Sequence, residues 1–156
     1  MRCEIRRLHP HEVDQALALA LETFLEFEAP DYGPEGVAAF CRDVIDSAAF
    51  RAACMDGANR MWGALDGTRI IGMMAMRGES HIALAFTHRD YHRQGVASAI
   101  LRQLLADVRR ENPAVRRITL NSSPCGLPFY LQAGFQPAGP ERTIHGIRHT
   151  PMTCDL

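Results

Sequence analysis

Apolar residues recur at helical spacing over the first third of the chain. A short strand is expected over residues 3–8, and Pro10 suits the first turn of a helix. The spacing predicts one amphipathic face made of Val13, Ala16, Leu17, Ala20, Phe24 and Phe27. Residues 29–34 break this helix, and a second one, apolar on one side from Val37 to Ile45, begins at or after Pro34. Two helices therefore precede the main run of strands.

Three apolar runs follow, over residues 60–65, 69–76 and 80–87. Asp66-Gly67 joins the first two, and this dipeptide tolerates positive φ, so the two runs should form an antiparallel hairpin. Gly78-Glu79 leads into the third run. The clearest helix of the chain extends from Gly95 to about Arg110, with apolar residues at helical spacing.

A strand over residues 117–120 is expected to lie parallel to 80–87, because a helix crosses over between them. A short helix over 127–132 follows, and weaker strand signals occur near Phe135 and over 148–154. This order predicts an α/β fold with a single mixed, mostly antiparallel sheet and flanking helices. At 156 residues with 47% hydrophobic, the chain is expected to form one domain over residues 1–156.

The overall charge excludes a strong global preference for nucleic acid or anionic membranes, because the formal net charge is −1. No apolar run approaches the roughly 18 residues of a membrane span, and the N-terminus lacks the apolar stretch of a signal peptide. A cytoplasmic protein without membrane association is expected. The five cysteines are scattered without a CxxC pair, which argues against a disulfide framework and against a metal site.

Charge is distributed unevenly along the chain. Residues 12–35 contain seven acids and no arginine, whereas residues 89–117 contain seven arginines and three acids. This pattern fits a molecule with an acidic and a basic region, and it fits equally two solvated helix faces. The arginines also allow a nucleic-acid-binding domain, but the neutral total charge and the lack of interleaved aromatic residues speak against it.

The segment 83–98 has the form of a strand, a short glycine-containing loop and a long helix. A loop that enters a helix presents unpaired backbone N–H groups at the positive end of the helix dipole, where an anion can bind. Gly95 and Ala97 would let a phosphate approach closely. The alternative is that the glycine only makes a turn.

Two motifs in this order resemble the GNAT acetyltransferase superfamily. Residues 91–97, Tyr-His-Arg-Gln-Gly-Val-Ala, resemble its pyrophosphate loop, and residues 128–135, Pro-Phe-Tyr-Leu-Gln-Ala-Gly-Phe, resemble its tyrosine followed by Gly-Phe. The order of elements matches over essentially the whole chain. The resemblance implies a GNAT-like sheet with a central splayed strand pair, and transfer of an acetyl group from acetyl-CoA to a primary amine.

The resemblance also implies which residues bind acetyl-CoA. Backbone amides of the loop and first helical turn would hold the pyrophosphate, and the backbone of the splayed strand would pair with the pantetheine arm. His92 replaces the family's Gln or Arg, and Ser123 stands where many relatives have an asparagine. The expected binding residues are Phe86, Thr87, His92, Arg93, Gln94, Gly95, Val96, Ala97, Ser98 and Ser123.

Tyr130 is the candidate general acid, because a phenol can protonate the departing CoA thiolate. The alternative is a tyrosine that only packs under the sheet. His81 is the candidate base that deprotonates the amine, directly or through water, since it lies fourteen positions before Gly95, where histone-acetylating relatives carry a glutamate. A half-buried histidine bonded to the next strand is the alternative. His88 and Glu79 are weaker candidates.

In this superfamily the first two helices and the loop between them line the acceptor cleft. Glu26, Glu28 and Asp31 are therefore expected to face a cationic small molecule or a peptide amine, and Tyr32, Phe27 and Trp62 to add an aromatic wall. For Phe27 and Trp62 the alternative is a place in the core. A non-catalytic acyl-CoA-binding regulatory module of the same fold is the rival function, and a homodimer is an open possibility.

Overall fold

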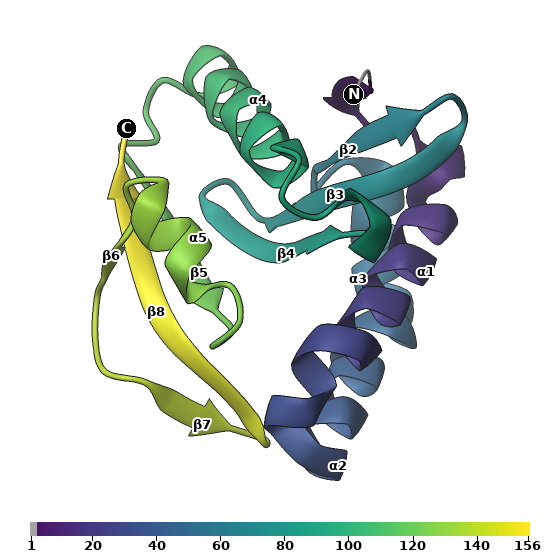
Figure 1. Ribbon diagram of the computed structural model, residues 1–156. Coiled ribbons are helices and arrows are strands. Elements are labelled where there is room, and N and C mark those ends of the chain that lie inside the picture. The colour runs from purple at the N-terminus through teal and green to yellow at the C-terminus, as the bar shows by residue number, and fades with distance from the viewer. Residues whose placement is uncertain (1–2) are drawn as a thin grey trace.

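The computed structural model of the protein describes residues 3–156 and is shown in Figure 1. Its N-terminal part is one strand followed by three helices. A π-helical turn, Phe24–Glu28, joins α1 directly to α2; a second one, Cys41–Ile45, extends α2, and residues 46–47 separate it from α3. The elements are β1 (Glu4–Arg7), a 3₁₀ turn (Pro10–Glu12), α1 (Val13–Thr23), α2 (Ala29–Phe40) and α3 (Ala48–Asp56).

The remaining elements complete the sheet and add two further helices. Their bounds are β2 (Met61–Asp66), β3 (Arg69–Arg77), β4 (His81–Thr87), α4 (Val96–Glu111), β5 (Arg117–Ser122), α5 (Leu127–Gln132), β6 (Gln136–Pro137), β7 (Arg142–Ile144) and β8 (Ile147–Asp155). The strand order is β1-β2-β3-β4-β5-β8-β6, and β7 pairs with β8. Among the strand pairs of residues 3–156, only β4 and β5 are parallel. The predicted α/β fold with a single mixed, mostly antiparallel sheet is confirmed.

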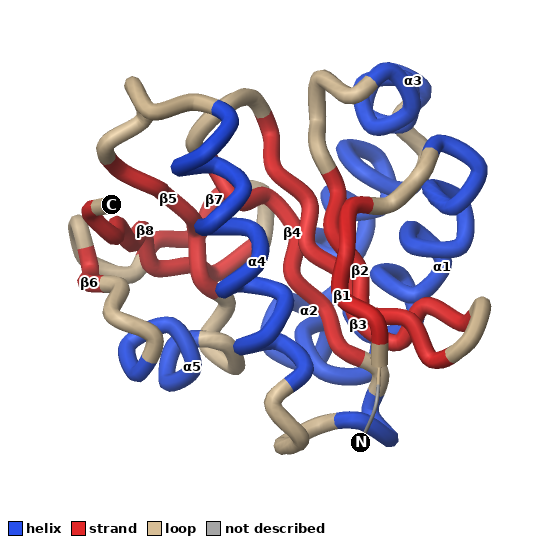
Figure 2. Tube along the Cα trace, turned by 90° about the horizontal axis from the view of Figure 1, so that it is seen from above, coloured by secondary structure: helices blue, strands red, loops and turns tan. Residues whose placement is uncertain are grey.

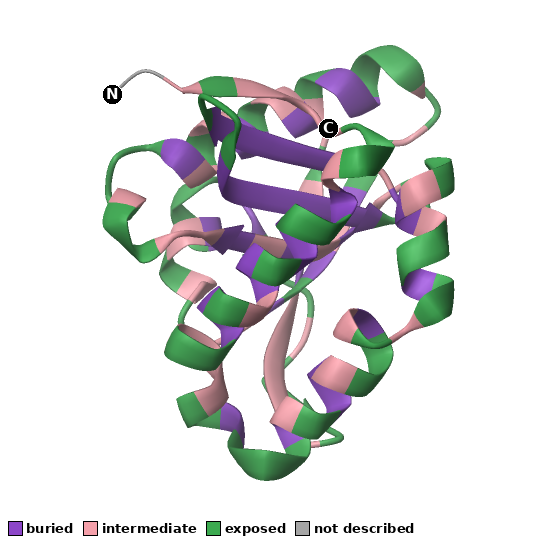
Figure 3. Ribbon diagram, turned by 90° about the vertical axis from the view of Figure 1, so that its right-hand side faces the viewer, coloured by how far each residue is buried: buried purple, intermediate pink, exposed green. Residues whose placement is uncertain are grey.

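Helices cover both faces of the sheet, as Figure 2 shows. One core lies between the sheet and α1 to α3, with Phe24 and Phe40 stacked at a ring distance of 3.9 Å. The other lies beneath α4 and α5 and contains Trp62, Ile100 and Tyr130. In Figure 3 the buried positions follow the central strands, and the outer helix faces are exposed. Burial on both faces explains why β2 and β3 are nearly continuous apolar runs.

β4 and β5 separate soon after they begin. They are paired only at His81 with Thr119 and at Ile82 with Leu120. On the other side of β4, Met76 pairs with Ile82 and Ala75 with Leu84, so Ala83 is an extra residue and forms a bulge. Because a bulge bends the strand that contains it, β4 turns away from β5 here. The predicted central splayed strand pair is confirmed.

Three details of the sequence prediction were wrong: helix α3, strand β7 and the position of the β2–β3 turn. Helix α3 was missed, although Ser47 caps its first turn by accepting from the Phe50 N–H at 3.0 Å. Strand β7 was missed as well. The β2–β3 turn lies one residue later than expected, since Asp66 already pairs with Arg69. The expected break before Pro34 is present, because Gly33 has a non-helical φ of 68° and divides α2 into a turn from Ala29 and a helix that continues from Pro34.

Candidate active site

Two cavities open where β4 and β5 diverge. The α2-side cavity has a volume of about 400 Å³ and extends along α2 toward β7 and β8. The α4-side cavity has a volume of about 500 Å³ and extends toward the start of α4. Both are lined by Glu28, Ala85, Phe86, Ser123, Gly126 and Tyr130. A molecule in one cavity is therefore adjacent to a molecule in the other at these shared residues.

The loop before α4 forms the far end of the α4-side cavity. Gly95 has φ of 79°, a conformation that favours glycine, and a Cβ there would meet open space. Among residues 3–156, no acceptor is found for the first-turn N–H groups of Val96, Ala97 and Ser98. These donors lie at the positive end of a sixteen-residue helix, so the geometry suits an anion.

Most of the residues expected to hold acetyl-CoA line this cavity. Gln94 is the exception, because its side-chain amide donates to the Asp90 carbonyl at 3.1 Å. His92 lies with Nε2 2.7 Å from the Thr87 carbonyl oxygen and packs on the Phe27 ring at 4.7 Å. The residues that line the cavity as expected are Phe86, Thr87, His92, Arg93, Gly95, Val96, Ala97, Ser98 and Ser123.

Tyr130 lies in α5 at the wall common to both cavities. Its ring packs against Phe129 and Phe135 at 5.1 and 5.6 Å, and 8% of its surface is exposed. A Cβ on Gly126 would come within 3.3 Å of the ring, so a glycine leaves room for this packing. Burial, assisted by the charge of Glu28, raises the pKa of the phenol. Tyr130 therefore keeps its proton at neutral pH.

Glu28 ends the first π-helical turn and reaches the same wall. The Tyr32 hydroxyl donates to its carboxylate at 3.3 Å. Burial raises the pKa of Glu28 to about 7; the Tyr32 hydrogen bond opposes this change, and the charge of Asp31 adds to it. Tyr32 itself has a raised pKa because of its burial and the charge of Glu28. The carboxyl group therefore changes charge close to neutral pH.

The other two acids expected at the acceptor cleft do not line either cavity. Glu26 forms an ion pair with Arg89 at 3.0 Å, and this pair joins the acidic and basic segments of the sequence. Asp31 is exposed. Of the four residues predicted to contact the acceptor, Glu28 and Tyr32 line the α2-side cavity.

His81 lies at the paired start of β4, outside the lining of both cavities. Its Nδ1 is 2.8 Å from the Thr119 hydroxyl, on the neighbouring strand. Burial, assisted by Arg77, lowers the pKa of the imidazole. This geometry resembles the alternative of a half-buried histidine bonded to the next strand. A role for His81 as the base stays a prediction.

The weaker candidates also lie outside the cavity walls. His88 accepts from the Asp90 N–H at 3.1 Å and has Nε2 3.2 Å from Arg69. The Glu79 carbonyl oxygen, in the turn before β4, accepts from Arg60 at 3.3 Å.

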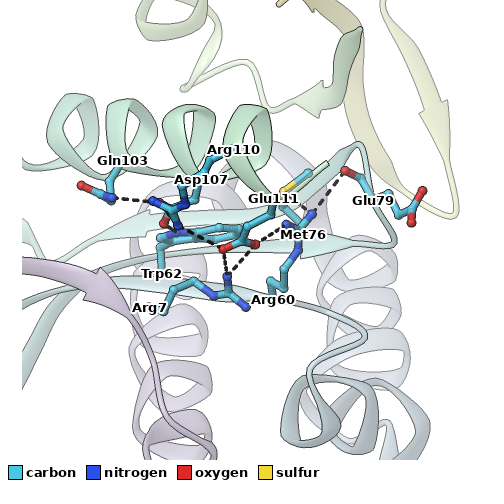
Figure 4. A network of polar contacts seen from close by, with 9 residues as sticks. All are labelled: Arg7, Arg60, Trp62, Met76, Glu79, Gln103, Asp107, Arg110 and Glu111. Carbon is cyan, nitrogen blue, oxygen red and sulfur yellow. Dashed lines mark hydrogen bonds and ion pairs between the residues drawn. The ribbon is translucent and has the colours of Figure 1, made fainter. Parts of the chain in front are cut away.

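Of the two alternatives for Trp62, an acceptor wall and a place in the core, the structure shows the core. Trp62 is fully buried beneath α4, and its Nε1 donates to Asp107 at 2.8 Å (Figure 4). The guanidinium groups of Arg7 and Arg60 lie 4.9 and 5.5 Å from the centre of its ring, and Glu111 accepts from both arginines. Alternation along β2 directs Trp62 to the α4 side, whereas Met61 faces the other helices. Phe27 lines the α4-side cavity instead of the acceptor side.

Sequence reasoning missed the polar end of the α2-side cavity. Asp43, Arg77, His145 and His149 line it. They come from the second π-helical turn, the end of β3 and the β7–β8 hairpin. No local motif connects such distant positions, and β7 was not predicted. Within the described part of the chain, no group of three or more His, Cys, Asp or Glu side chains is placed to hold a metal ion.

Comparison with known proteins identifies the family. The sequence model described as "Acetyltransferase (GNAT) domain" matches residues 28–156. The chain belongs to the GNAT acetyltransferase family. Among curated relatives of this GNAT protein, the uncharacterized N-acetyltransferase YafP of Escherichia coli is 25% identical over 139 residues, which is 89% of this chain and 85% of YafP. Serotonin N-acetyltransferase of Mesocricetus auratus is 32% identical over 78 residues, or 49% of this chain and 37% of the hamster protein.

Solved GNAT structures share the fold at low sequence identity. A GCN5-related N-acetyltransferase from Rhodopseudomonas palustris has a TM-score of 0.83 at 21% identity, covering 100% of this chain and 97% of its own. The PaiA N-acetyltransferase from Thermoplasma acidophilum, in complex with coenzyme A, has a TM-score of 0.79 at 16% identity, with both chains fully covered. No helix within residues 3–156 is long and apolar enough to cross a membrane.

Proposed function

We propose that this GNAT protein transfers an acetyl group from acetyl-CoA to a primary amine by direct attack. The observation that carries the proposal is the meeting of two cavities at Tyr130. A direct transfer needs the thioester and the amine side by side, with a proton donor within reach of the sulfur. The wall shared by the two cavities, with Tyr130 in it, supports the proposal on both counts.

The α4-side cavity is assigned to acetyl-CoA. The first-turn amides of α4 would bind the pyrophosphate, and the bare edge of β4 at Phe86 and Thr87 would pair with the pantetheine arm. These contacts would bring the thioester to Ser123 and Tyr130. The structurally similar PaiA protein was solved in complex with coenzyme A, which supports acetyl-CoA as the donor.

The α2-side cavity is assigned to the acceptor amine, a cationic small molecule or a peptide amine. Aromatic rings of Phe24, Tyr32, Phe40 and Phe86 line it together with the Glu28 carboxylate. Such a wall attracts an ammonium group through charge and through the faces of the rings. The similarity to serotonin N-acetyltransferase supports including aromatic alkylamines among the candidate acceptors.

Acetyl-CoA should raise the melting temperature of the wild-type protein, because a ligand that binds the folded state stabilises it. Gly95→Glu should abolish this rise by placing a bulky negative side chain where the pyrophosphate binds. Gly57→Glu is the matched control: Gly57 has φ of 87°, and a Cβ there also meets open space, but it ends α3 and lines neither cavity. Differential scanning fluorimetry with and without acetyl-CoA measures both variants.

Both variants are expected to lose some stability through positive φ, so the ligand-induced shift decides the outcome. A normal shift in Gly95→Glu contradicts the assignment of the loop. Transfer is tested by release of free thiol with polyamines, aminoglycosides, amino acids, peptide N-termini and aromatic alkylamines. Binding of acetyl-CoA without thiol release for any amine would instead indicate a non-catalytic acyl-CoA-binding module.

A further inference from the structure

Glu28 is the only carboxylate among residues 3–156 that lines both cavities. The α2-side cavity contains one other carboxylate, Asp43, which is exposed and held by the Arg42 guanidinium at 2.9 and 3.1 Å. Glu28 instead lies at the wall that the amine and the thioester would share. A group that removes a proton directly from the attacking nitrogen must lie at this wall.

The surroundings of Glu28 leave its charge without a cation. Within the described chain it forms no ion pair, whereas Glu26, two positions earlier, pairs with Arg89. Tyr32 and Asp31 on α2 influence the pKa of Glu28, and the charge of Glu28 raises the pKa values of Tyr130 on α5 and Cys125 before α5. β4 contributes only Ala85 and Phe86 to the shared wall. An incoming ammonium group would therefore be the counter-ion that this carboxylate lacks.

We propose that Glu28 is the general base that deprotonates the acceptor ammonium group, and that Tyr32 is a positioning residue that orients its carboxylate. The proposal rests on the proposed acetyl transfer. Two observations support it: the place of Glu28 in both walls and the Tyr32 hydroxyl 3.3 Å from its Oε1. A carboxyl group with a pKa of about 7 is also a stronger base than an ordinary glutamate, and about half of it is ionised at pH 7.

The proton balance then uses two residues of one wall. Glu28 takes a proton from the ammonium group and later releases it to solvent. The free nitrogen attacks the thioester carbon, a C–N bond forms and the C–S bond breaks. The sulfur leaves with the bond electrons and receives the Tyr130 proton. The second proton of the attacking nitrogen returns to the Tyr130 oxygen, so the products are amide, free thiol and one proton in solution.

The geometry favours Glu28 over His81, which touches neither cavity and bonds to Thr119. If Glu28 is the base, Glu28→Gln should lose the pH dependence of kcat/KM; if His81 is the base, His81→Ala should lose it. The test uses 2-phenylethylamine, whose amino group is protonated at pH 7, and aniline, whose amino group is already neutral. Glu28→Gln keeps an oxygen that accepts from Tyr32 and removes only the basicity.

For wild type, kcat/KM with 2-phenylethylamine should rise with pH through an ionisation near 7. Glu28→Gln should lower it by about 10²-fold or more at pH 7 and flatten this rise, with a much smaller loss for aniline. Tyr32→Phe should move the rise to higher pH, because the lost hydrogen bond favoured the carboxylate. Glu22→Gln, an exposed acid on α1, is the control that should match wild type.

The acetyl-CoA-induced rise in melting temperature, which should persist in Glu28→Gln, shows that the variant is folded and binds the donor. An unchanged pH profile in Glu28→Gln overturns the assignment of the base, as does loss of the rise in His81→Ala alone. If wild type binds acetyl-CoA but releases no thiol with any amine, the proposed function fails, and the assignment of the base fails with it.

Discussion

At the scale of single residues, Tyr130 has a packing role and a proposed chemical role that a conservative substitution separates. Its ring fills the space between Phe129, Phe135 and Gly126, and Tyr130→Phe keeps that ring. Removal of the hydroxyl should lower kcat by about 10²-fold and leave the KM for acetyl-CoA nearly unchanged. Thiol release at saturating substrate measures the change. Equal turnover, with chemistry shown to limit the rate, would leave Tyr130 only its packing role.

The sequence predicts some site residues and not others for physical reasons. Tyr130 and Gly95 lie in contiguous motifs, so their segments are recognisable without coordinates. The sequence does not show which acid faces the cavity, because the π-helical turn at Phe24–Glu28 changes the direction in which the following side chains point around the helix. In addition, Glu26 is held away by Arg89, a partner 63 positions along the chain. Helical periodicity records neither the change of phase nor the distant ion pair.

At the scale of elements, the tip of the β7–β8 hairpin rests directly on α2. Gly146 has φ of 79°, and a Cβ there would lie 2.6 Å from the Gly36 backbone nitrogen. Gly146→Ala should therefore push the hairpin off α2, open the α2-side cavity, lower the melting temperature and raise the acceptor KM more than the acetyl-CoA KM. Gly78→Ala, with φ of 65° and open space around its Cβ, is the control for positive φ alone.

Calorimetry and steady-state kinetics on these two variants separate the two effects. Strain at positive φ costs roughly 1 kcal/mol in both, so Gly146→Ala should be the less stable variant by the additional cost of the backbone clash. Equal stability and equal acceptor KM would show that the hairpin adapts without leaving α2.

Some short elements were predicted closely: α5 covers the expected residues 127–132, and β5 begins at Arg117 as expected but extends two residues beyond the predicted end at 120. Helix α3 was missed because Ser47 and Gly57 are its only clear boundary signals, and because only two of its nine residues, Phe50 and Cys54, are buried apolar positions. β7 has three exposed residues and is defined by its pairing with β8. Short elements whose formation depends on tertiary partners carry little local signal.

At the scale of the whole molecule, the site forms because the sheet is continuous where β4 and β5 begin and open where they diverge. β4 and β5 pair at two positions and then diverge, and the helices of both faces reach the opening. The order of elements and the two motifs together predicted this topology. The sequence alone did not predict the polar end of the α2-side cavity, because Arg77 and His149 come together only when β3 and β8 occupy their places in the sheet.

The shared wall also makes the stability of the whole fold depend on pH. Glu28 has a pKa of about 7 in the folded protein and an ordinary value of 4.5 in the unfolded chain, so the folded state binds the proton more tightly. The stability that protonation gives is present below pH 4.5 and is lost as the pH rises through 7. Glu28→Gln stays neutral and should avoid this loss.

The melting temperature of Glu28→Gln should therefore approach that of wild type near pH 4.5 and exceed it increasingly up to pH 7. Because Glu28 is partly exposed, solvent screening reduces the effect, and a gain of about 1–3 kcal/mol at pH 8 is expected. The exposed control Glu22→Gln should show no such trend. The Arg6–Glu12 pair is present in all three proteins, so its effect on stability cancels from the comparison. A difference in melting temperature between Glu28→Gln and wild type that does not change with pH would contradict the burial of this carboxylate. The neutral glutamine is the more stable side chain only at pH values at which the buried Glu28 must be charged.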